Sequence, residues 1–195
     1  MGKERMEMFS DGVIAILITV MVLELKAPAG EALKDLTAVG PTFLSYVLSF
    51  VYLAIYWNNH HHMLRVARTI TGGIMWANTH LLFWLSLIPF TTSWMGEHPT
   101  AAAPTAVYGA NLILCGCAYS ILATLLARHE GRESPLTRAL GRDLKGKLSL
   151  VAYAIGIAAA WVQPLVSIAV YAGVACTWLV PDRRMERAVR DEGEA

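Results

Sequence analysis

Charged residues are scarce in this chain, and they are unevenly spread. Only 16% of the residues are Asp, Glu, Lys or Arg, whereas a typical soluble protein has roughly 25%. Three long stretches, residues 70–95, 99–127 and 148–180, contain none of them. A helix of about 20 apolar residues crosses the hydrocarbon core of a bilayer, which is about 30 Å thick. The composition therefore excludes an ordinary soluble domain and predicts an all-helical integral membrane protein.

Signatures of several other protein classes are also missing. No basic run alternates with aromatic residues, so we expect no nucleic-acid partner. The three cysteines lie in apolar runs without metal-site spacing, and we expect them to be buried and inert. Ser86, Thr91, Thr92 and Ser93 have no base at a catalytic spacing, which argues against a membrane hydrolase, and we expect no enzyme. The first apolar run, from about Met8, contains Asp11 and lacks a small-residue cleavage site, so no cleavable signal peptide is expected.

Six apolar segments are predicted to cross the membrane within a single domain of residues 1–195. These spans cover residues 8–25, 41–60, 73–95, 103–127, 148–162 and 165–180. Pro89 should kink the third span. Gln163-Pro164 should form the turn of a short helical hairpin, because the last apolar run is too long for one span. Ser134-Pro135 is expected to begin a short surface helix.

The distribution of basic residues predicts an orientation. With six spans drawn in this way, only Lys26 and Lys34 of the 16 Lys and Arg residues fall on one side of the membrane. Lys and Arg accumulate in cytoplasmic loops. Both termini are therefore predicted to be cytoplasmic, in a multi-pass protein surrounded by membrane lipid.

The first span contains polar residues that need an explanation, because an ionised side chain at the bilayer centre costs about 2.5–3.5 kcal/mol on insertion scales. At 100° per residue, one stripe about 100° wide contains Gly12, Ile16, Thr19, Val20 and Leu23. Asp11 lies about 140° from Ile16 on the helix. The stripe could simply pack against neighbouring helices, with Ser10 and Asp11 as helix caps. Alternatively, the stripe has one functional role, and the polar patch formed by Ser10 and Asp11 has another.

The first span resembles the first helix of the transmembrane protein 175 family, the bacterial relatives of the endolysosomal potassium channel. The matching residues are Arg5, Phe9-Ser10-Asp11-Gly12, Ala15-Ile16, Thr19 and Val22-Leu23-Glu24. Weaker similarity covers the rest of the chain, including Tyr56–His60 and Trp84–Phe90. The resemblance implies a homotetramer in a bacterial cytoplasmic membrane, with the first helices lining a central pore. It further implies a potassium-preferring cation channel that passes potassium ions and needs no cofactor. The family lacks the Thr-Val-Gly-Tyr-Gly filter of other potassium channels, and so does this sequence.

The resemblance also implies roles for individual residues. Ile16 would form an aliphatic constriction, with Val20 and Leu23 one and two turns further out. The hydroxyl of Thr19 would contribute to potassium preference. Phe9, Ser10 and Asp11 would tie the first helix to its neighbours, with Arg5 as their basic partner; these are the signature residues. Many relatives carry Leu or Ile in place of Val20, so the second ring is expected to be looser here.

Histidines and one further acid complete the candidates. His80, near Asn78 in the third span, is expected to join the hydrogen-bonded network that holds the first helix. The run from His60 to His62 could bind zinc, but adjacent helical residues point in different directions, so hydrogen bonds between helices and capping are favoured. Glu24 could either form an acidic ring at the outer mouth or lie at a solvated helix end.

Two rival functions remain open. The first is a secondary transporter of a small solute or proton that uses Asp11, His80 and Glu24, although no inverted repeat is visible in the sequence. The second is a membrane enzyme or assembly factor with the histidine run from His60 to His62 as its site.

Overall fold

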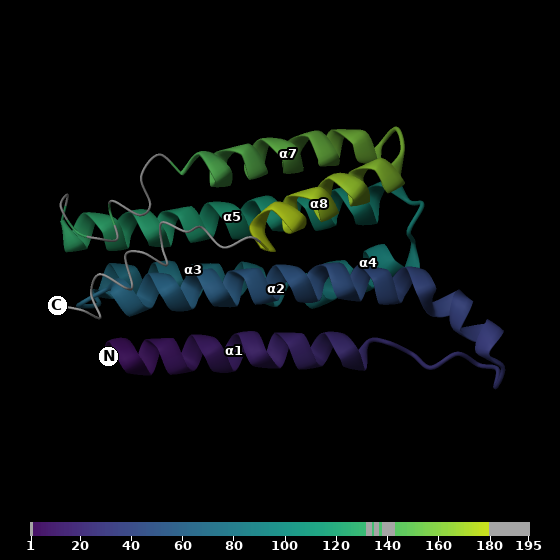
Figure 1. Cartoon of the computed structure of the whole chain (residues 1–195), viewed down its shortest axis with the longest axis horizontal. Coiled ribbons are helices and arrows are strands. Elements are labelled where there is room, and N and C mark those ends of the chain that lie inside the picture. The colour runs from purple at the N-terminus through teal and green to yellow at the C-terminus, as the bar shows by residue number, and fades with distance from the viewer. Residues whose placement is uncertain (1, 132–133, 135–136, 138–142, 180–195) are drawn as a thin grey trace.

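The structure, a computed structural model, describes residues 2–131, 134, 137 and 143–179. In this part of the chain it consists of helices without any strand, packed side by side, with α1 at one edge of the bundle and α7 at the other (Figure 1). The elements are α1 (Lys3–Leu23), the 3-10 helix η1 (Leu33–Val39), α2 (Gly40–Val66), α3 (Gly72–Ser86), α4 (Ile88–Glu97), α5 (Ala102–Glu130), α7 (Leu144–Ala160) and α8 (Pro164–Leu179). The predicted all-helical fold is confirmed.

Within the described residues, six rods stand where the six spans were predicted, if α3 and α4 are counted as one bent rod. The helices Lys3–Leu23 and Ala102–Glu130 and the helical stretch Leu33–Val66 are each long and apolar enough to cross a membrane by themselves. Helix α1 begins before the predicted start of its span, and α2 continues beyond the predicted end of its span. Which residues lie within the bilayer stays a prediction. The surface helix expected after Pro135 and the end of the last span at Val180 lie outside the described residues.

The third rod is broken at Leu87, which separates α3 from α4. Pro89 lies in the first turn of α4 and has no N–H to donate to the carbonyl of Leu85, with which its ring would clash. Helical hydrogen bonding resumes directly after the break, since the amide of Thr91 donates to the carbonyl of Leu87 over 3.1 Å. The third span is thus interrupted next to Pro89, and the size of the predicted kink stays a prediction.

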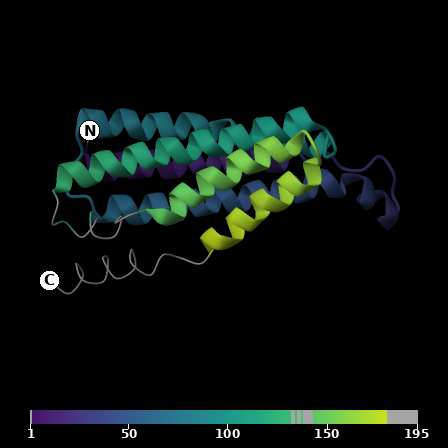
Figure 2. The ribbon, with the colours of Figure 1, turned by 90° about the horizontal axis from the view of Figure 1, so that it is seen from above.

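Helices α7 and α8 form the predicted hairpin, with the turn at residues 161–163 immediately before Pro164. The hairpin packs on α5 through α7 and reaches α2 through α8 (Figure 2). Tyr171 of α8 is inserted so closely that a Cβ atom at Gly109 or Gly156 would overlap with its ring or hydroxyl. These two glycines therefore permit the close packing of α5, α7 and α8.

Two apolar clusters form the core. One joins α1 and α3 to α2 and α5, and includes the fully buried Leu53, Leu81 and Leu122. The other joins α2, α5, α7 and α8 around the buried Tyr52 and Tyr171. The outside is apolar as well, with exposed large side chains that include Trp76, Phe83, Phe90, Ile121, Ile155, Val162 and Leu165. Lipid is a solvent in which such a surface is stable, and the chain is a multi-pass membrane protein.

The cysteines differ in their surroundings. Cys115 is buried, Cys117 is half-buried and Cys176 is exposed. The expectation that all three are buried is wrong for Cys176, because α8 lies at the periphery of the bundle and an apolar run of the sequence also covers its outer face.

Candidate pore-lining helix and its anchors

Helix α1 presents only one face to the rest of the chain. Its buried residues are Met6, Ser10, Ile14, Leu17 and Met21. They recur at intervals of three or four, which places them on one side of the helix. This side packs against α2, α3 and α4. The remaining circumference of α1 has no partner of its own within the described subunit.

The stripe predicted to line the pore lies on this unpartnered circumference. The exposed fractions are 61% for Ile16, 37% for Val20 and 80% for Leu23. Gly12 and Thr19 are exposed as well. Most of the stripe is therefore not packed against other helices of the described subunit, and only Val20 borders a groove between α1 and α4. That the stripe faces a pore stays a prediction.

Thr19 differs from its neighbours on the stripe by its hydroxyl group. This hydroxyl donates to the carbonyl of Ile16 over 2.8 Å, on the same helix. Because its hydrogen is used in this way, the exposed oxygen has lone pairs left with which to face a cation or water.

A buried chain of hydrogen bonds joins α1 to α3 and α2. Nδ2 of Asn78 donates to Oγ of Ser10 over 2.9 Å, and Oδ1 of Asn78 pairs with Nε2 of His60 at 2.7 Å. The Ser10 hydroxyl donates in turn to the carbonyl of Met6 over 2.9 Å. Ser10, His60 and Asn78 are at most 2% exposed. In an apolar environment the loss of one member leaves the others unsatisfied, so the chain fixes how α1 is rotated against its neighbours.

A second pair of contacts joins α1 and α2 closer to the protein surface. Trp57 Nε1 donates to Oδ1 of Asp11 over 3.0 Å, and one turn away Nδ1 of His61 lies 3.0 Å from Oε1 of Glu7. The rings of Trp57 and His61 are stacked with their centroids 6.1 Å apart. The two contacts form an antiparallel ladder, which sets the register of α1 along α2.

The proposed capping role of Ser10 and Asp11 is wrong. Helix α1 begins at Lys3 with Gly2 as its N-cap, so both residues lie inside the helix. Their polar groups instead bond to α3 and α2. The capping role considered for the histidine run is wrong for the same reason, because α2 continues to Val66.

The other signature residues have different surroundings. Phe9 is 55% exposed, and Arg5 is exposed and forms no ion pair with the residues that the structure describes. Both lie on the unpartnered circumference of α1. Their expected role in holding α1 within its own subunit is therefore not visible, and a role at a contact between subunits stays a prediction.

The prediction for His80 is wrong. His80 is exposed on α3 and accepts a hydrogen bond from Nε1 of Trp84 over 2.8 Å, one turn further along the same helix. The histidine that belongs to the buried network is His60. Sequence reasoning gave His60 only a general role between helices. It missed Asn78 as the partner of His60 and Ser10, and Trp57 as the partner of Asp11. The available signal was Asn78, a second polar residue two positions before His80 in the apolar third span.

Glu24 lies at the end of α1, opposite to the end with Asp11. Oγ of Ser93 donates to Oε2 of Glu24 over 3.4 Å, and the two residues line a groove between α1 and α4 together with Val20 and Glu97. Glu24 lies thirteen positions after Asp11 along the helix, which corresponds to a distance of about 20 Å. The groups named for a transporter, Asp11, Glu24 and His80, therefore do not converge on one site.

The three consecutive histidines also point to different surroundings. His60 bonds to Asn78, His61 contacts Glu7, and Nδ1 of His62 is buried without a hydrogen-bond partner. Among the described residues no group of three potential ligands could hold a metal ion. The arrangement gives no support to the histidine run as an enzymatic centre.

Residues 5–89 match the family model described as endosomal/lysosomal potassium channel TMEM175. A protein of Chryseobacterium sp. (strain P1-3), described as a potassium channel, is 46% identical over 191 residues, which cover 98% of this chain and 100% of that protein. A potassium channel of Chamaesiphon minutus is 30% identical, with coverage of 82% and 86%.

A solved structure shares the fold. The crystal structure of a lysosomal potassium-selective channel TMEM175 homolog from Chamaesiphon minutus superposes with a TM-score of 0.80 at 25% identity, covering 92% of this chain and 97% of that chain. The structural similarity covers more of the chain than residues 5–89, which the family model matches. The chain belongs to the TMEM175 family.

Proposed function

We propose that the chain is one subunit of a homotetrameric, potassium-preferring cation channel whose pore is lined by α1. The observation that carries this proposal is the exposed apolar stripe along α1, opposite a face that is fully packed. Because one side of α1 is fixed by packing, the opposite side presents the same residues in a defined direction. The names of the relatives in Chryseobacterium and Chamaesiphon support potassium as the permeant ion.

In the proposed assembly, four copies of α1 meet around an axis. Four Ile16 side chains form an apolar ring that gates by excluding water, because ions cannot pass a dry constriction. Val20 and Leu23 add wider rings toward the outer end. The Thr19 hydroxyls face the pore between these rings and favour potassium.

The anchors keep the stripe directed at the axis. The buried chain through Ser10 and Asn78 resists rotation of α1, and the ladder of Asp11 and Glu7 with α2 resists sliding. The channel conducts passively, without covalent chemistry or a cofactor. We place it in the cytoplasmic membrane of a bacterium, with both termini in the cytoplasm, because the basic residues accumulate on that side.

Conduction is tested with purified protein in a planar bilayer under a potassium gradient. Ile16→Asn should raise the current, because a polar ring wets the constriction. The matched control is Ile155→Asn on α7, where the isoleucine is also exposed, at 58% compared with 61% for Ile16. This control should leave the current as it was.

The outcome separates the channel from its rival. Equal currents for both variants and the unmodified protein would remove Ile16 from the gate. Flux that saturates with potassium concentration, without single-channel steps, would contradict a channel and favour a transporter.

A further inference from the structure

Two different surfaces flank the exposed stripe of α1, one on each side. Asp11 bonds to α2, and Val20 borders the groove between α1 and α4. Val20 lies nine positions after Asp11, and nine steps of 100° bring it to the opposite side of the helix. Helix α2 therefore lies on one side of α1, and the groove lies on the other. When copies of α1 meet around an axis, the α2 side of each subunit faces the α4 side of the next.

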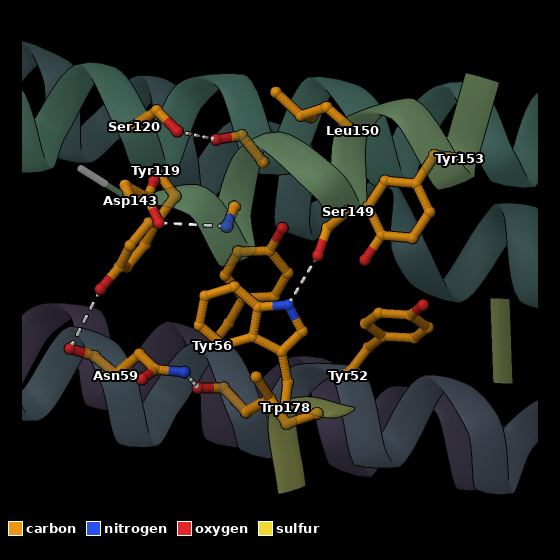
Figure 3. Close-up of a pocket in the computed structure, with 13 residues that line it drawn as sticks. Tyr52, Tyr56, Asn59, Tyr119, Ser120, Asp143, Ser149, Leu150, Tyr153 and Trp178 are labelled. Atoms are coloured by element: carbon orange, nitrogen blue, oxygen red, sulfur yellow. Dashed lines mark hydrogen bonds between the residues drawn. The ribbon is translucent and has the colours of Figure 1, made fainter. Parts of the chain in front are cut away.

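The α2 side carries an aromatic ridge, formed by Phe43, Tyr46 and Phe50. Phe43 and Phe50 lie seven positions apart on one face of α2, and they are 52% and 40% exposed. The Tyr46 ring contacts both, with its centroid 6.2 Å from that of Phe43 and 6.1 Å from that of Phe50. Figure 3 shows that Tyr52 and Tyr56 of the same helix lie among aromatic side chains of α5, α7 and α8, inside the subunit. The two phenylalanines of the ridge have no such surroundings and point out of the subunit.

The ridge borders α1 directly. Tyr46 packs against the apolar cluster that includes the buried face of α1. Trp57, which bonds to Asp11, lies seven positions after Phe50 and thus on the same face of α2. The ridge therefore extends toward the outer end the same side of α2 that holds α1 near its N-terminus.

The α4 side carries the groove between α1 and α4, which opens to the outside of the subunit. It has a volume of about 530 Å³, and Leu17, Val20, Phe90 and Trp94 are among its lining residues. Phe90 is 63% exposed, and its ring stacks on that of Trp94 with the centroids 6.3 Å apart. Sites of about 300–1,000 Å³ accommodate molecules larger than one aromatic side chain. The groove thus has room for rings of another helix.

The ridge and the groove lie at the same height along the bundle. The hydroxyl of Thr42 donates to the carbonyl of Gly96 over 3.2 Å, and the hydroxyls of Ser49 and Thr92 are 2.6 Å apart. Thr42 and Ser49 directly precede the two phenylalanines of the ridge. Gly96 and Thr92 lie within residues 89–97 of α4, the part that lines the groove. A rotation around an axis along the helices leaves heights unchanged, so the two surfaces are level where neighbouring subunits meet.

We propose that the aromatic ridge of each subunit packs into the groove between α1 and α4 of the next subunit. This inference rests on the proposed function, because it requires α1 helices that meet at an axis. The contact is head to tail, so that two different surfaces meet and repetition of one rotation closes a ring. Van der Waals packing drives the association of helices in lipid, and interlocking aromatic rings supply such packing. Each subunit is then held by its neighbour directly beside the stripe.

Polar groups of the two surfaces complement each other as well. The hydroxyl of Tyr46 forms no hydrogen bond with other residues that the structure describes. The groove contains Ser93 and the carboxylate of Glu24, whose mutual contact of 3.4 Å leaves acceptor capacity on the carboxylate. When the ridge packs into the groove, the Tyr46 hydroxyl gains an acceptor at this level of the bundle.

The proposal is tested on the full-length protein with its three native cysteines replaced. Phe50→Cys and Phe90→Cys are introduced together or singly, and thiols are joined with a short bismaleimide, which does not require the strict geometry of a disulfide. We expect covalent dimers, trimers and tetramers of the double variant on denaturing gels, and monomers for each single variant. Phe50→Cys combined with Ile155→Cys is the control and should remain monomeric, because α7 lies at the edge of the bundle opposite to α1 (Figure 1).

Two outcomes would overturn the proposal. Dimers of either single variant would show that like surfaces meet, and a monomeric double variant would show that the groove is filled by lipid. Ile16→Cys in the same background reports separately on the proposed function, since its cross-linking requires only α1 helices that meet at an axis. Cross-linked Ile16→Cys beside a monomeric double variant would refute the contact of ridge and groove alone.

Truncation of the ridge provides a second measurement that needs no cysteine. Phe50→Ala should raise the concentration at which the assembly dissociates in detergent by about tenfold, because aromatic anchors carry much of the energy of an interface. Ile121→Ala is the control, since Ile121 is similarly exposed, at 46%, but lies on α5 away from both surfaces. Equal dissociation of the two variants would contradict a role of the ridge between subunits.

Discussion

Asn78 is the residue at which three helices are connected. It donates to Ser10 of α1 and bonds to His60 of α2 from its own place on α3. The net gain from a hydrogen bond is modest, but a buried polar group left without its partner costs considerably more. The hydrogen bonds of Asn78 therefore contribute more to the orientation of α1 than to the total stability of the protein.

The first prediction concerns the hydrogen bonds of Asn78. Asn78→Leu keeps the approximate size of the side chain but leaves Ser10 and His60 unsatisfied, and should destabilise the protein by about 1–3 kcal/mol. Thr79→Val is the control, because Thr79 is exposed and bonds only within α3. Thermal unfolding in detergent measures both variants. Equal unfolding temperatures of the two variants would show that the buried hydrogen bonds of Asn78 do not stabilise the protein to this extent.

Thr19 is the only hydroxyl on the stripe, and its hydrogen is already donated to Ile16. Its oxygen is thus oriented with its lone pairs free, as a group that faces a cation must be. No other residue of the stripe offers an oxygen atom from its side chain.

The second prediction follows from this orientation. Thr19→Val preserves the shape of the side chain but removes the oxygen, and should reduce the preference for potassium over sodium. Reversal potentials with potassium on one side and sodium on the other measure it. Thr124→Val on α5 is matched, because Thr124 is exposed and also bonds to its own helix. A reversal potential unchanged by Thr19→Val would exclude the hydroxyl from selectivity.

At the scale of helices, the sequence predicted which side of a helix is exposed better than it predicted which residues bond between helices. The stripe on α1 follows from 100° per residue, and the break next to Pro89 and the turn before Pro164 follow from the chemistry of proline. The choice of His60 over His80 does not follow, because it depends on how α2 and α3 are rotated against α1. Such long-range packing has no local signal in a single sequence.

The same limit applies to the ends of helices. Ser10 and Asp11 have the side chains of N-caps, yet α1 begins at Lys3. Local propensity was overridden because these polar groups find partners on α2 and α3. The packing of the hairpin around Tyr171 could not be predicted either. Gly109 and Gly156 lie in different helices, and the sequence does not show that they meet at Tyr171.

The third prediction tests the packing of the hairpin. Gly156→Ala places a methyl group where the ring of Tyr171 lies, and should destabilise the protein by about 1–3 kcal/mol. Gly173→Ala on α8 meets no atom within 4 Å and should be neutral or stabilising, by up to about 1 kcal/mol. Denaturation in detergent compares the two. Similar effects of both would mean that Tyr171 moves aside without cost.

For the whole molecule, the decisive question is whether four copies bring their α1 helices together. The fourth prediction uses a variant in which Cys115, Cys117 and Cys176 are replaced and Ile16→Cys is introduced. Oxidation should join subunits into covalent dimers, because thiols near a common axis come within bonding distance. Denaturing gels detect these dimers.

The control is Ile155→Cys in the same background, on the outer surface of α7. It should remain monomeric on the gel, and native mass measurement should give four chains for both proteins. Absence of dimers with Ile16→Cys, or equal dimer formation in both, would contradict an axial α1.

The modest length of α7 has a consequence for the surrounding bilayer. Helix α7 has 17 residues between Asp143 and Trp161, and Lys145 and Lys147 occupy its first turn. Only residues 148–160 of α7 are then apolar, and this part of the helix is about 20 Å long. The hydrocarbon core of a bilayer is about 30 Å thick. Lipids at this rim must thin to match it. The protein should consequently be more stable in short-chain than in long-chain lipids, which the unfolding temperature in the two kinds of bilayer measures.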